Sequence, residues 1–354
     1  MLMSTPQPAR SDQSTAKATR LAYLVFERPD LDRAVQFLED FGLKVCRRTP
    51  DCVLLRGTES HSYCYRIHRA AESRFVGMGF EFDGIAALSA LARALPGSSI
   101  VRSKFGGLVL PLTDPSGFSV EAVCDLRVEP ALPHRSALTF NVEGRAIRID
   151  ETQRTPVAPP DVLRLGHVVL EVAEYQKTCA WYTQHMGMIP SDVQLLPDGS
   201  PAVTFLRLDL GQQPADHHTL ALAQGFAPLY SHSAYEVVDT DAVGMGQRLL
   251  KEKGWRHAWG MGRHVLGSQI FDYWQDPWGD KHEHYCDGDL FTADHPTGFH
   301  PTSRSGMAQW GQKMPASFSR PRITFRNIRA LIHSLRASPD LSIGKLLTLA
   351  RLFG

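Results

Sequence analysis

The sequence has few cysteines and pairs none of them in a short motif. Six occur in 354 residues without a CxxC spacing: Cys46, Cys52, Cys64, Cys124, Cys179 and Cys286. A chain of this length can bury a sizeable core without disulfides, which argues against a small disulfide-rich secreted class. The first 17 residues are polar and lack the apolar stretch of a signal peptide. We therefore expect a reduced, cytoplasmic compartment.

Long hydrophobic runs and an excess of one charge are also absent. No run reaches the length that a transmembrane helix needs. Hydrophobic residues make up 43% and charged residues 21%, and the net charge is +1. This composition is typical of a soluble globular protein, and it gives no reason to expect a nucleic-acid partner. Because 354 residues exceed what one core usually holds, two domains are expected.

The sequence contains a weak internal repeat. Residues 20–43 and 164–188 each read as an apolar strand, an amphipathic helix and a closing glycine. Further along, Asp114-Pro115-Ser116-Gly117 and Asp276-Pro277-Trp278-Gly279 each form an Asp-Pro-x-Gly turn ahead of an alternating strand. The repeat predicts an α+β fold in which two copies of one plan follow each other, each copy with two βαβββ units.

The domain boundaries follow from this repeat and from composition. We expect a disordered tail over residues 1–17, a first domain over 18–127, a Pro-rich linker with some strand content over 128–161, a second domain over 162–290 and a basic extension over 291–354. From Pro301 onward there are nine Lys or Arg and one acid, a net charge of +8, so the rest of the chain carries −7.

The extension has helical periodicity in two places. Ile328, Leu331, Ile332 and Leu335 share one helical face, and four leucines between 346 and 352 suggest a second short helix after Pro339. We expect these helices to dock on their own domain or on a neighbouring subunit. The alternative is contact with a membrane surface or an acidic partner.

Three residues in separate predicted strands form a candidate metal site. His167 lies in Leu-Gly-His-Val-Val-Leu, His232 in His-Ser-Ala-Tyr-Glu-Val, and Glu283 follows the second Asp-Pro-x-Gly turn. Two imidazoles and one carboxylate on one face of a metal are the ligand set of non-haem Fe(II) oxygenases. By strand alternation, His282 and His284 fall on the face opposite Glu283, and we expect them to be exposed or flanking.

The repeat tests this hypothesis. The first copy has Tyr23 where the second has His167, and Gly77 where the second has His232. Only Glu121 matches Glu283. The first copy therefore cannot assemble the three ligands, and we expect it to be a scaffold beside a working second copy.

Further segments complete the pattern. They are Gly262-Arg263-His264, the strand Gln269–Tyr273, and His217-His218-Thr219-Leu220. His264 and Tyr273 are nine residues apart, and Glu283 follows Tyr273 by ten. Together with the three ligand candidates, these residues resemble the two-domain type I extradiol dioxygenases of the vicinal oxygen chelate superfamily, over about residues 18–290 and most strongly over 163–290.

The resemblance implies a fold, a reaction and a set of roles. Paired βαβββ modules would form an open barrel around a central cleft in each domain. His167, His232 and Glu283 would bind Fe(II), although ligand type alone does not separate Fe(II) from Mn(II). A catechol and O2 would react by cleavage of the ring beside the diol, giving a muconate semialdehyde-type product. We also expect a homo-oligomer.

The resemblance assigns the remaining polar residues to proton transfer and positioning. His218 matches the family's acid–base histidine better than His217 does, and only one of the two can face inward on a strand. A histidine poised near neutral pH suits the deprotonation of a catechol. His264 and Tyr273 would orient the ring through hydrogen bonds to its oxygens.

Two other classes of function share this scaffold. Glyoxalase-like isomerases and thiol transferases that inactivate epoxide antibiotics use similar His/Glu metal sites, but they do not call for the His264–Tyr273 pair. A non-catalytic drug-binding protein does not need three metal ligands.

Overall fold

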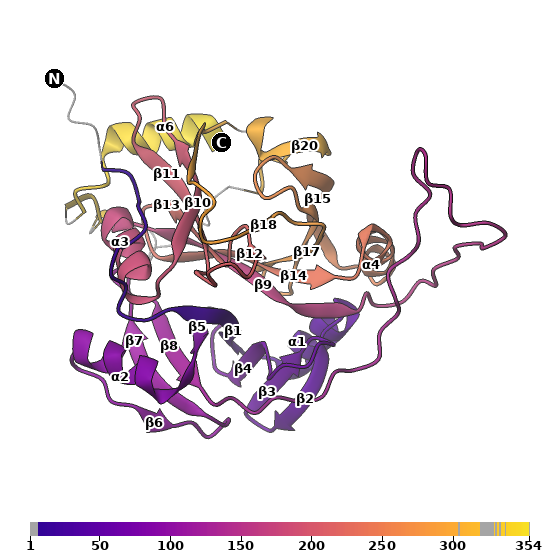
Figure 1. The fold of residues 1–354 in the computed structure, drawn as a ribbon, viewed down its shortest axis with the longest axis horizontal. Coiled ribbons are helices and arrows are strands. Elements are labelled where there is room, and N and C mark those ends of the chain that lie inside the picture. Colours follow the sequence, from indigo (N-terminus) through magenta and orange to yellow (C-terminus); the bar gives the residue numbers. More distant parts are fainter. Residues whose placement is uncertain are drawn as a thin grey trace.

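The computed structural model describes residues 6–303, 305–318, 329, 331–332, 334–336 and 338–353. Its elements form two sheet-rich domains joined by a long connection (Figure 1). Among the described helices, none combines the length and the apolar character needed to cross a membrane.

The first domain is one eight-stranded sheet with two helices. Its strands lie in the order β2-β3-β4-β1-β5-β8-β7-β6. The elements in chain order are β1 (Ala18–Arg28), α1 (Leu31–Asp40), β2 (Lys44–Thr49), β3 (Cys52–Arg56), β4 (Tyr65–Arg69), β5 (Arg74–Phe82), α2 (Gly84–Ala94), β6 (Val101–Arg102), β7 (Leu108–Thr113) and β8 (Ser119–Cys124).

The second domain is a ten-stranded sheet of the same plan with an extra strand at each edge. Its order is β19-β10-β11-β13-β9-β14-β17-β16-β15-β20, and β12 pairs with β18 in a separate ribbon. The elements before residue 290 are β9 (Val162–Val172), α3 (Tyr175–His185), β10 (Ile189–Leu195), β11 (Pro201–Arg207), β12 (Ala215–Asp216), β13 (Leu220–Gln224), β14 (Leu229–Val237), α4 (Thr240–Glu252), β15 (Arg256–His264), β16 (Ile270–Gln275) and β17 (Lys281–Cys286). The later ones are β18 (Leu290–Phe291), β19 (Gly298–Pro301), the 3-10 turn η1 (Ser305–Met307), β20 (Ala308–Gly311) and α6 (Ile343–Phe353).

The predicted α+β fold of paired βαβββ modules is confirmed. In each domain the two modules meet through their first strands, which pair antiparallel as β1 with β5 and as β9 with β14. The last strand of each second module, β8 or β17, pairs parallel with its own first strand. The sheets stay open and curved rather than closing into barrels.

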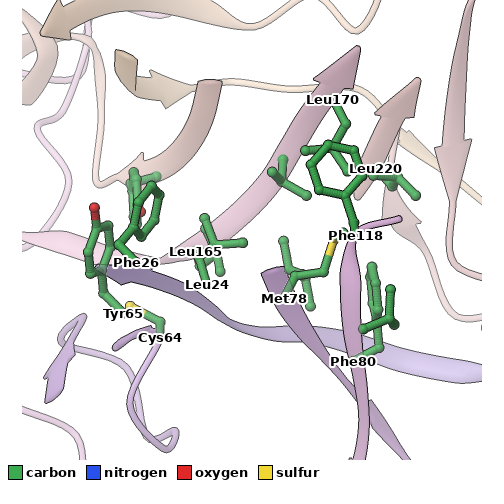
Figure 2. Close-up of a cluster of buried hydrophobic side chains, with 14 of the residues drawn as sticks. Leu24, Phe26, Cys64, Tyr65, Met78, Phe80, Phe118, Leu165, Leu170 and Leu220 are labelled. Atoms are coloured by element: carbon green, nitrogen blue, oxygen red, sulfur yellow. The ribbon is translucent and has the colours of Figure 1, made fainter. Parts of the chain in front are cut away.

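The main hydrophobic core is shared by the two domains. Even-numbered residues of β9, such as Val168 and Leu170, enter one buried cluster together with Leu24 and Phe26 of β1. Figure 2 shows side chains from both domains in this cluster, with Leu165, Leu170 and Leu220 beside Leu24, Met78 and Phe118. A register shift separates Leu165 from His167, and because side chains alternate along a strand, His167, Val169 and Glu171 point away from this core.

The expectation that His282 and His284 are exposed is wrong, although their predicted face is right. Both side chains are fully buried, because the face of β17 opposite Glu283 packs on the first domain. His284 stacks on Phe41 and lies 2.7 Å from the Phe41 carbonyl through Nε2. His282 Nε2 lies 3.1 Å from the hydroxyl of Tyr65. Burial lowers the pKa of His284 to about 4, so it donates to Phe41 as a neutral ring.

The segments outside the two repeats differ from expectation. The expected disordered tail is wrong for residues 6–17, which lie on the second domain: the amide of Thr15 donates to Gln184 O at 2.7 Å, and Arg10 and Lys17 both pair with Asp209. No strand forms in residues 128–161, which contain one isolated bridge between Val142 and Arg145.

The basic extension is partly built into the second sheet. β19 pairs with β10 and β20 pairs with β15, so the sheet continues beyond the expected boundary at residue 290. The predicted second helix is α6, which packs on its own domain. Of the predicted first helical face, Ile328 lies outside the described residues.

Candidate metal centre

The three ligand candidates come together on adjacent central strands. Ala234 of β14 pairs with His167 of β9 on one side and with Glu283 of β17 on the other, and His232 lies two residues before Ala234. Residues that pair directly, and residues two apart on one strand, share a face of the sheet. The small side chain of Ala234 leaves space between the three larger ones. Their ligand atoms all lie within 4.8 Å of one another.

The spacing fits a shared ion better than hydrogen bonds. Oε2 of Glu283 lies 3.4 Å from Nε2 of His167 and 3.5 Å from Nε2 of His232. These separations exceed the usual range of an N–H···O bond. Two donors that each lie about 2.1 Å from a common ion are about 3 to 3.4 Å apart. The nitrogen–oxygen distances therefore match donors arranged around one cation.

The electrostatics of Glu283 also call for a cation. The side chain is 0% exposed, and neither carboxylate oxygen has a hydrogen-bond partner. Burial alone would raise its pKa, but the neighbouring His167 and His264 outweigh this and hold the pKa well below its usual value. Burial lowers the pKa of His232 well below its usual value, which leaves a neutral imidazole. A buried carboxylate without a partner costs several kcal/mol unless a cation compensates it. The residues present thus fit a divalent metal.

His218, rather than His217, faces the candidate centre. Its ring lies 4.0 Å from that of His167, centroid to centroid, and it lines the cavity in front of the three ligand candidates. Burial lowers the pKa of His218 well below its usual value, and the nearby His167 and His217 lower it further. His218 is therefore neutral and able to accept a proton.

A hydrogen-bonded chain behind His218 was not predicted from the sequence. Nδ1 of His218 lies 2.9 Å from Nδ1 of His217, whose Nε2 lies 2.6 Å from Oδ2 of Asp192. The other oxygen of Asp192 lies 2.8 Å from Nε2 of His300. Burial raises the pKa of Asp192, but hydrogen bonds with the two histidines outweigh this and lower it. Asp192 is thus a carboxylate that accepts from His217.

His264 and Tyr273 contact each other beside the candidate centre. His264 Nε2 lies 2.9 Å from the hydroxyl of Tyr273, and its Nδ1 lies 2.9 Å from the carbonyl oxygen of Met307. Since a carbonyl only accepts, Nδ1 carries a proton, and a neutral His264 would accept from Tyr273 through Nε2. Tyr273 also meets His232 edge-on, and His264 Nε2 lies 3.5 Å from Glu283. Met307 belongs to the C-terminal extension, which therefore helps to position His264.

All six predicted site residues except Glu283 line one cavity of about 500 Å³. Its wall is mostly apolar, and it includes Phe205, Leu266, Met314 and residues of α6. A largely apolar pocket with a few convergent polar groups is typical of a small-molecule site. Glu283 is on β17, beside the strand β14 that carries His232, and does not line the cavity.

The first domain shows what the same positions do without the histidines. Gly77 pairs with Val25 as His232 pairs with Val169, and Gly79 pairs with Glu121 as Ala234 pairs with Glu283. The hydroxyl of Tyr23 donates to Glu121, which also pairs with Arg66 at 2.8 Å. A Cβ on Gly79 would lie 2.5 Å from the ring of Tyr23. The site is filled by side chains and holds no set of metal ligands.

Comparisons with known proteins identify relatives of this chain. A family model described as the Glyoxalase/Bleomycin resistance protein/Dioxygenase superfamily matches residues 164–283, a segment that contains all three ligand candidates. Metapyrocatechase 2 of Cupriavidus necator is 30% identical over 330 residues, which are 90% of this chain and 99% of that protein.

Two solved structures have a similar fold. The Mn(II)-bound glyoxalase from Novosphingobium aromaticivorans is 21% identical, with a TM-score of 0.71 over 88% of this chain and 97% of that one. An extradiol ring-cleaving dioxygenase from B. fuscum is 18% identical, with a TM-score of 0.71 over 91% of this chain and 87% of that one.

Proposed function

Because the chain belongs to the extradiol dioxygenases of the glyoxalase, bleomycin resistance protein and dioxygenase superfamily, we propose that it uses Fe(II) and O2 to cleave a catechol beside its diol. The product would be of the muconate semialdehyde type. The observation that carries this proposal is the convergence of His167, His232 and Glu283 with His218 and Tyr273 around one cavity.

The ligand set supports Fe(II), with Mn(II) as the alternative. Two imidazoles and one carboxylate occupy one side of the candidate centre, which leaves the cavity side open for exogenous ligands. A ferrous ion held there would supply the Lewis acidity and the electrons that let dioxygen react with an aromatic ring. Manganese is the alternative because a glyoxalase of similar fold has been solved with bound Mn(II).

The proposed role of His218 follows from the chain of hydrogen bonds behind it. The Asp192 carboxylate can only accept, so Nε2 of His217 carries a proton, and in a neutral His217 Nδ1 would be an acceptor. Nδ1 of His218 must then donate to His217, which leaves the lone pair of His218 on Nε2. Nε2 is thus the atom that would take the proton of a catechol hydroxyl and return a proton later.

His264 and Tyr273 would position the ring. With His264 neutral, the hydroxyl of Tyr273 would donate to it, and the phenolic oxygen would keep a lone pair for a substrate hydroxyl. The Met307 carbonyl fixes the orientation of His264, and Trp259 stacks parallel to Tyr273 with 5.5 Å between centroids. Such fixed groups reduce the freedom that must be lost when the ring is aligned for reaction.

The test is anaerobic loading with Fe(II), followed by a panel of catechols in air. We expect oxygen uptake together with a yellow ring-fission product, and a parallel Mn(II)-loaded sample separates the two metals. An absence of turnover with every catechol, at full metal occupancy, would contradict the proposal. Isomerisation of a hemithioacetal without oxygen uptake would instead identify a glyoxalase-like isomerase.

A further inference from the structure

The cavity extends far beyond the candidate metal centre. His167, Val169 and Glu171 occupy successive inward positions of β9, and all three line the cavity. Four residues of an extended strand span about 13 Å, so Glu171 lies well away from the metal ligands. On the neighbouring strand β13, Ala221 and Ala223 pair with Val169 and Glu171. Their small side chains leave open an apolar channel that runs along the sheet.

Helix α6 covers the far end of this channel. Leu346, Leu349 and Ala350 line the cavity, whereas Leu347 on the outer side is 54% exposed. Figure 1 shows α6 beside the ends of β11 and β10, across the second sheet. The segment before α6 is held at the same end of β9, where the hydroxyl of Ser338 donates to Ala173 O at 2.8 Å.

Glu171 places a carboxylate at this apolar end. No described residue forms a hydrogen bond or an ion pair with its side chain, and among the described residues it is the charge of Lys281 that acts on it. Burial raises the pKa of Glu171, and Lys281 opposes this. The equivalent residue of the first domain, Glu27, is instead paired with Arg74 at the surface. Glu171 is therefore a half-buried acceptor that faces a cavity without a partner from the described chain.

We propose that this channel is a subsite for the ring substituent, and that it selects a catechol with an elongated apolar substituent ending in a hydroxyl or amine that Glu171 accepts. The inference rests on the proposed catechol dioxygenase function, and it adds the class of catechol. The channel residues Val169, Ala221 and Ala223 would contact the apolar part, and α6 would close over it.

Binding measured without oxygen tests the subsite apart from turnover. Full-length Fe(II)-loaded protein is titrated anaerobically by calorimetry with catechol, with methyl-, butyl- and hexylcatechol, and with hexylcatechol that has a terminal hydroxyl. We expect Kd to fall about fourfold for each methylene that is buried. The terminal hydroxyl should bind about tenfold more tightly than the methyl-ended chain, because it donates to a carboxylate. A Kd that is independent of chain length would overturn the proposal.

Two variants test the residues. Glu171→Leu should reverse the preference between the hydroxyl-ended and methyl-ended chains while plain alkyl chains still bind. Leu349→Trp should fill the channel and remove the dependence on chain length, whereas Leu347→Trp on the exposed side of the same helix should keep it. An unchanged end-group preference in Glu171→Leu, or equal effects of the two tryptophans, would contradict the assignment.

The outcome of this experiment is separable from that of the proposed function. Length-dependent binding without ring cleavage in air would leave the subsite standing and remove the dioxygenase proposal. Ring cleavage of plain catechol without length-dependent binding would support the dioxygenase proposal and remove the subsite. If Leu349→Trp fails to fold, as judged by circular dichroism, the Glu171→Leu comparison still decides.

Discussion

At the scale of residues, the two domains place equivalent carboxylates in different chemical surroundings. Glu121 and Glu283 occupy the same place in the strand register, yet Glu121 pairs with the Arg66 cation and accepts a hydrogen bond from Tyr23. Glu283 has two histidines in those surroundings, and neither of its oxygens has a hydrogen-bond partner. The difference is chemical rather than architectural, because the strands that hold both carboxylates pair in the same way.

Replacing these two carboxylates is therefore a matched test of the metal centre. Glu283→Ala should lose iron on desalting. Removal of a residue that only hydrogen-bonds to a metal ligand weakens metal binding about 10- to 100-fold, and removal of a ligand itself should weaken it more. Glu121→Ala should keep its iron, as measured by metal analysis. Equal iron content in the two variants would contradict the assignment of the ligands.

Asp192 offers a second test at this scale. In Asp192→Asn the side chain can donate as well as accept, so the proton pattern of His217 and His218 is no longer fixed. We expect kcat for catechol cleavage to fall about 10- to 100-fold. The Kd for catechol without oxygen should hardly change. His300→Gln, which alters the outer partner whose side chain is 43% exposed, serves as the control and should have a small effect. A loss of catechol binding with unchanged kcat in Asp192→Asn would contradict the role of Asp192 in fixing the protons of His217 and His218.

At the scale of elements, the βαβββ modules were predictable and their attachments were not. Alternating strands and the Asp-Pro-x-Gly turns are local patterns, so the repeat could be read from residues 20–43 and 164–188. The strands β19 and β20 have no such pattern and form only because existing sheet edges accept them. The Asp192–His217–His300 chain likewise joins segments that no spacing rule connects.

Helix α4 shows how an element depends on a distant segment. Asp239 caps α4 by accepting from the amide of Ala242 at 2.9 Å, and it also accepts from Arg135 and the Leu138 amide of the long connection. Asp83 at the start of α2 is the equivalent residue of the first domain, and its side chain makes no capping bond. Asp239 therefore stabilises both the helix and the course of residues 128–161.

We expect Asp239→Ala to lower the free energy of unfolding by about 1 to 2 kcal/mol, and Asp83→Ala to change it much less. Burial raises the pKa of Asp239, but its bond with Arg135 and the two amides outweighs this, so the folded pKa lies below the unfolded value. Its stabilisation is complete above the unfolded pKa, about 3.9, and is lost as pH falls through the folded pKa. Urea unfolding at pH 7 and pH 3 measures both effects. A difference from wild type that grows on acidification would contradict this account.

At the scale of the whole molecule, the two domains share one hydrophobic core. One cluster of buried side chains extends from β1 to β17, and the buried Arg28 of the first domain pairs with Asp276 and Asp280 of the second at 2.9 and 2.8 Å. The sequence indicated two domains but not their packing, because contacts such as His284 on Phe41 join residues more than 200 positions apart. The scaffold domain thus supports the strand that carries Glu283 from behind.

Arg28→Met should destabilise the whole protein by about 3 to 5 kcal/mol, because it leaves two carboxylates at a buried interface without their cation. Arg74→Met removes an ion pair with Glu27 from a side chain that is 54% exposed, and it should cost at most about 1 kcal/mol. Calorimetry should show a single unfolding transition in wild type. Two separate transitions, one for each domain, would contradict the shared core.

The most direct test of the central claim is the fate of labelled dioxygen. Iron-loaded protein is given a catechol under 18O2, and the ring-fission product is trapped at once and analysed by mass spectrometry. An extradiol dioxygenase with the proposed site should place two labelled atoms in the product, apart from label lost by exchange with water. A product without label, or the absence of any ring-opened product at full iron occupancy, would contradict the account.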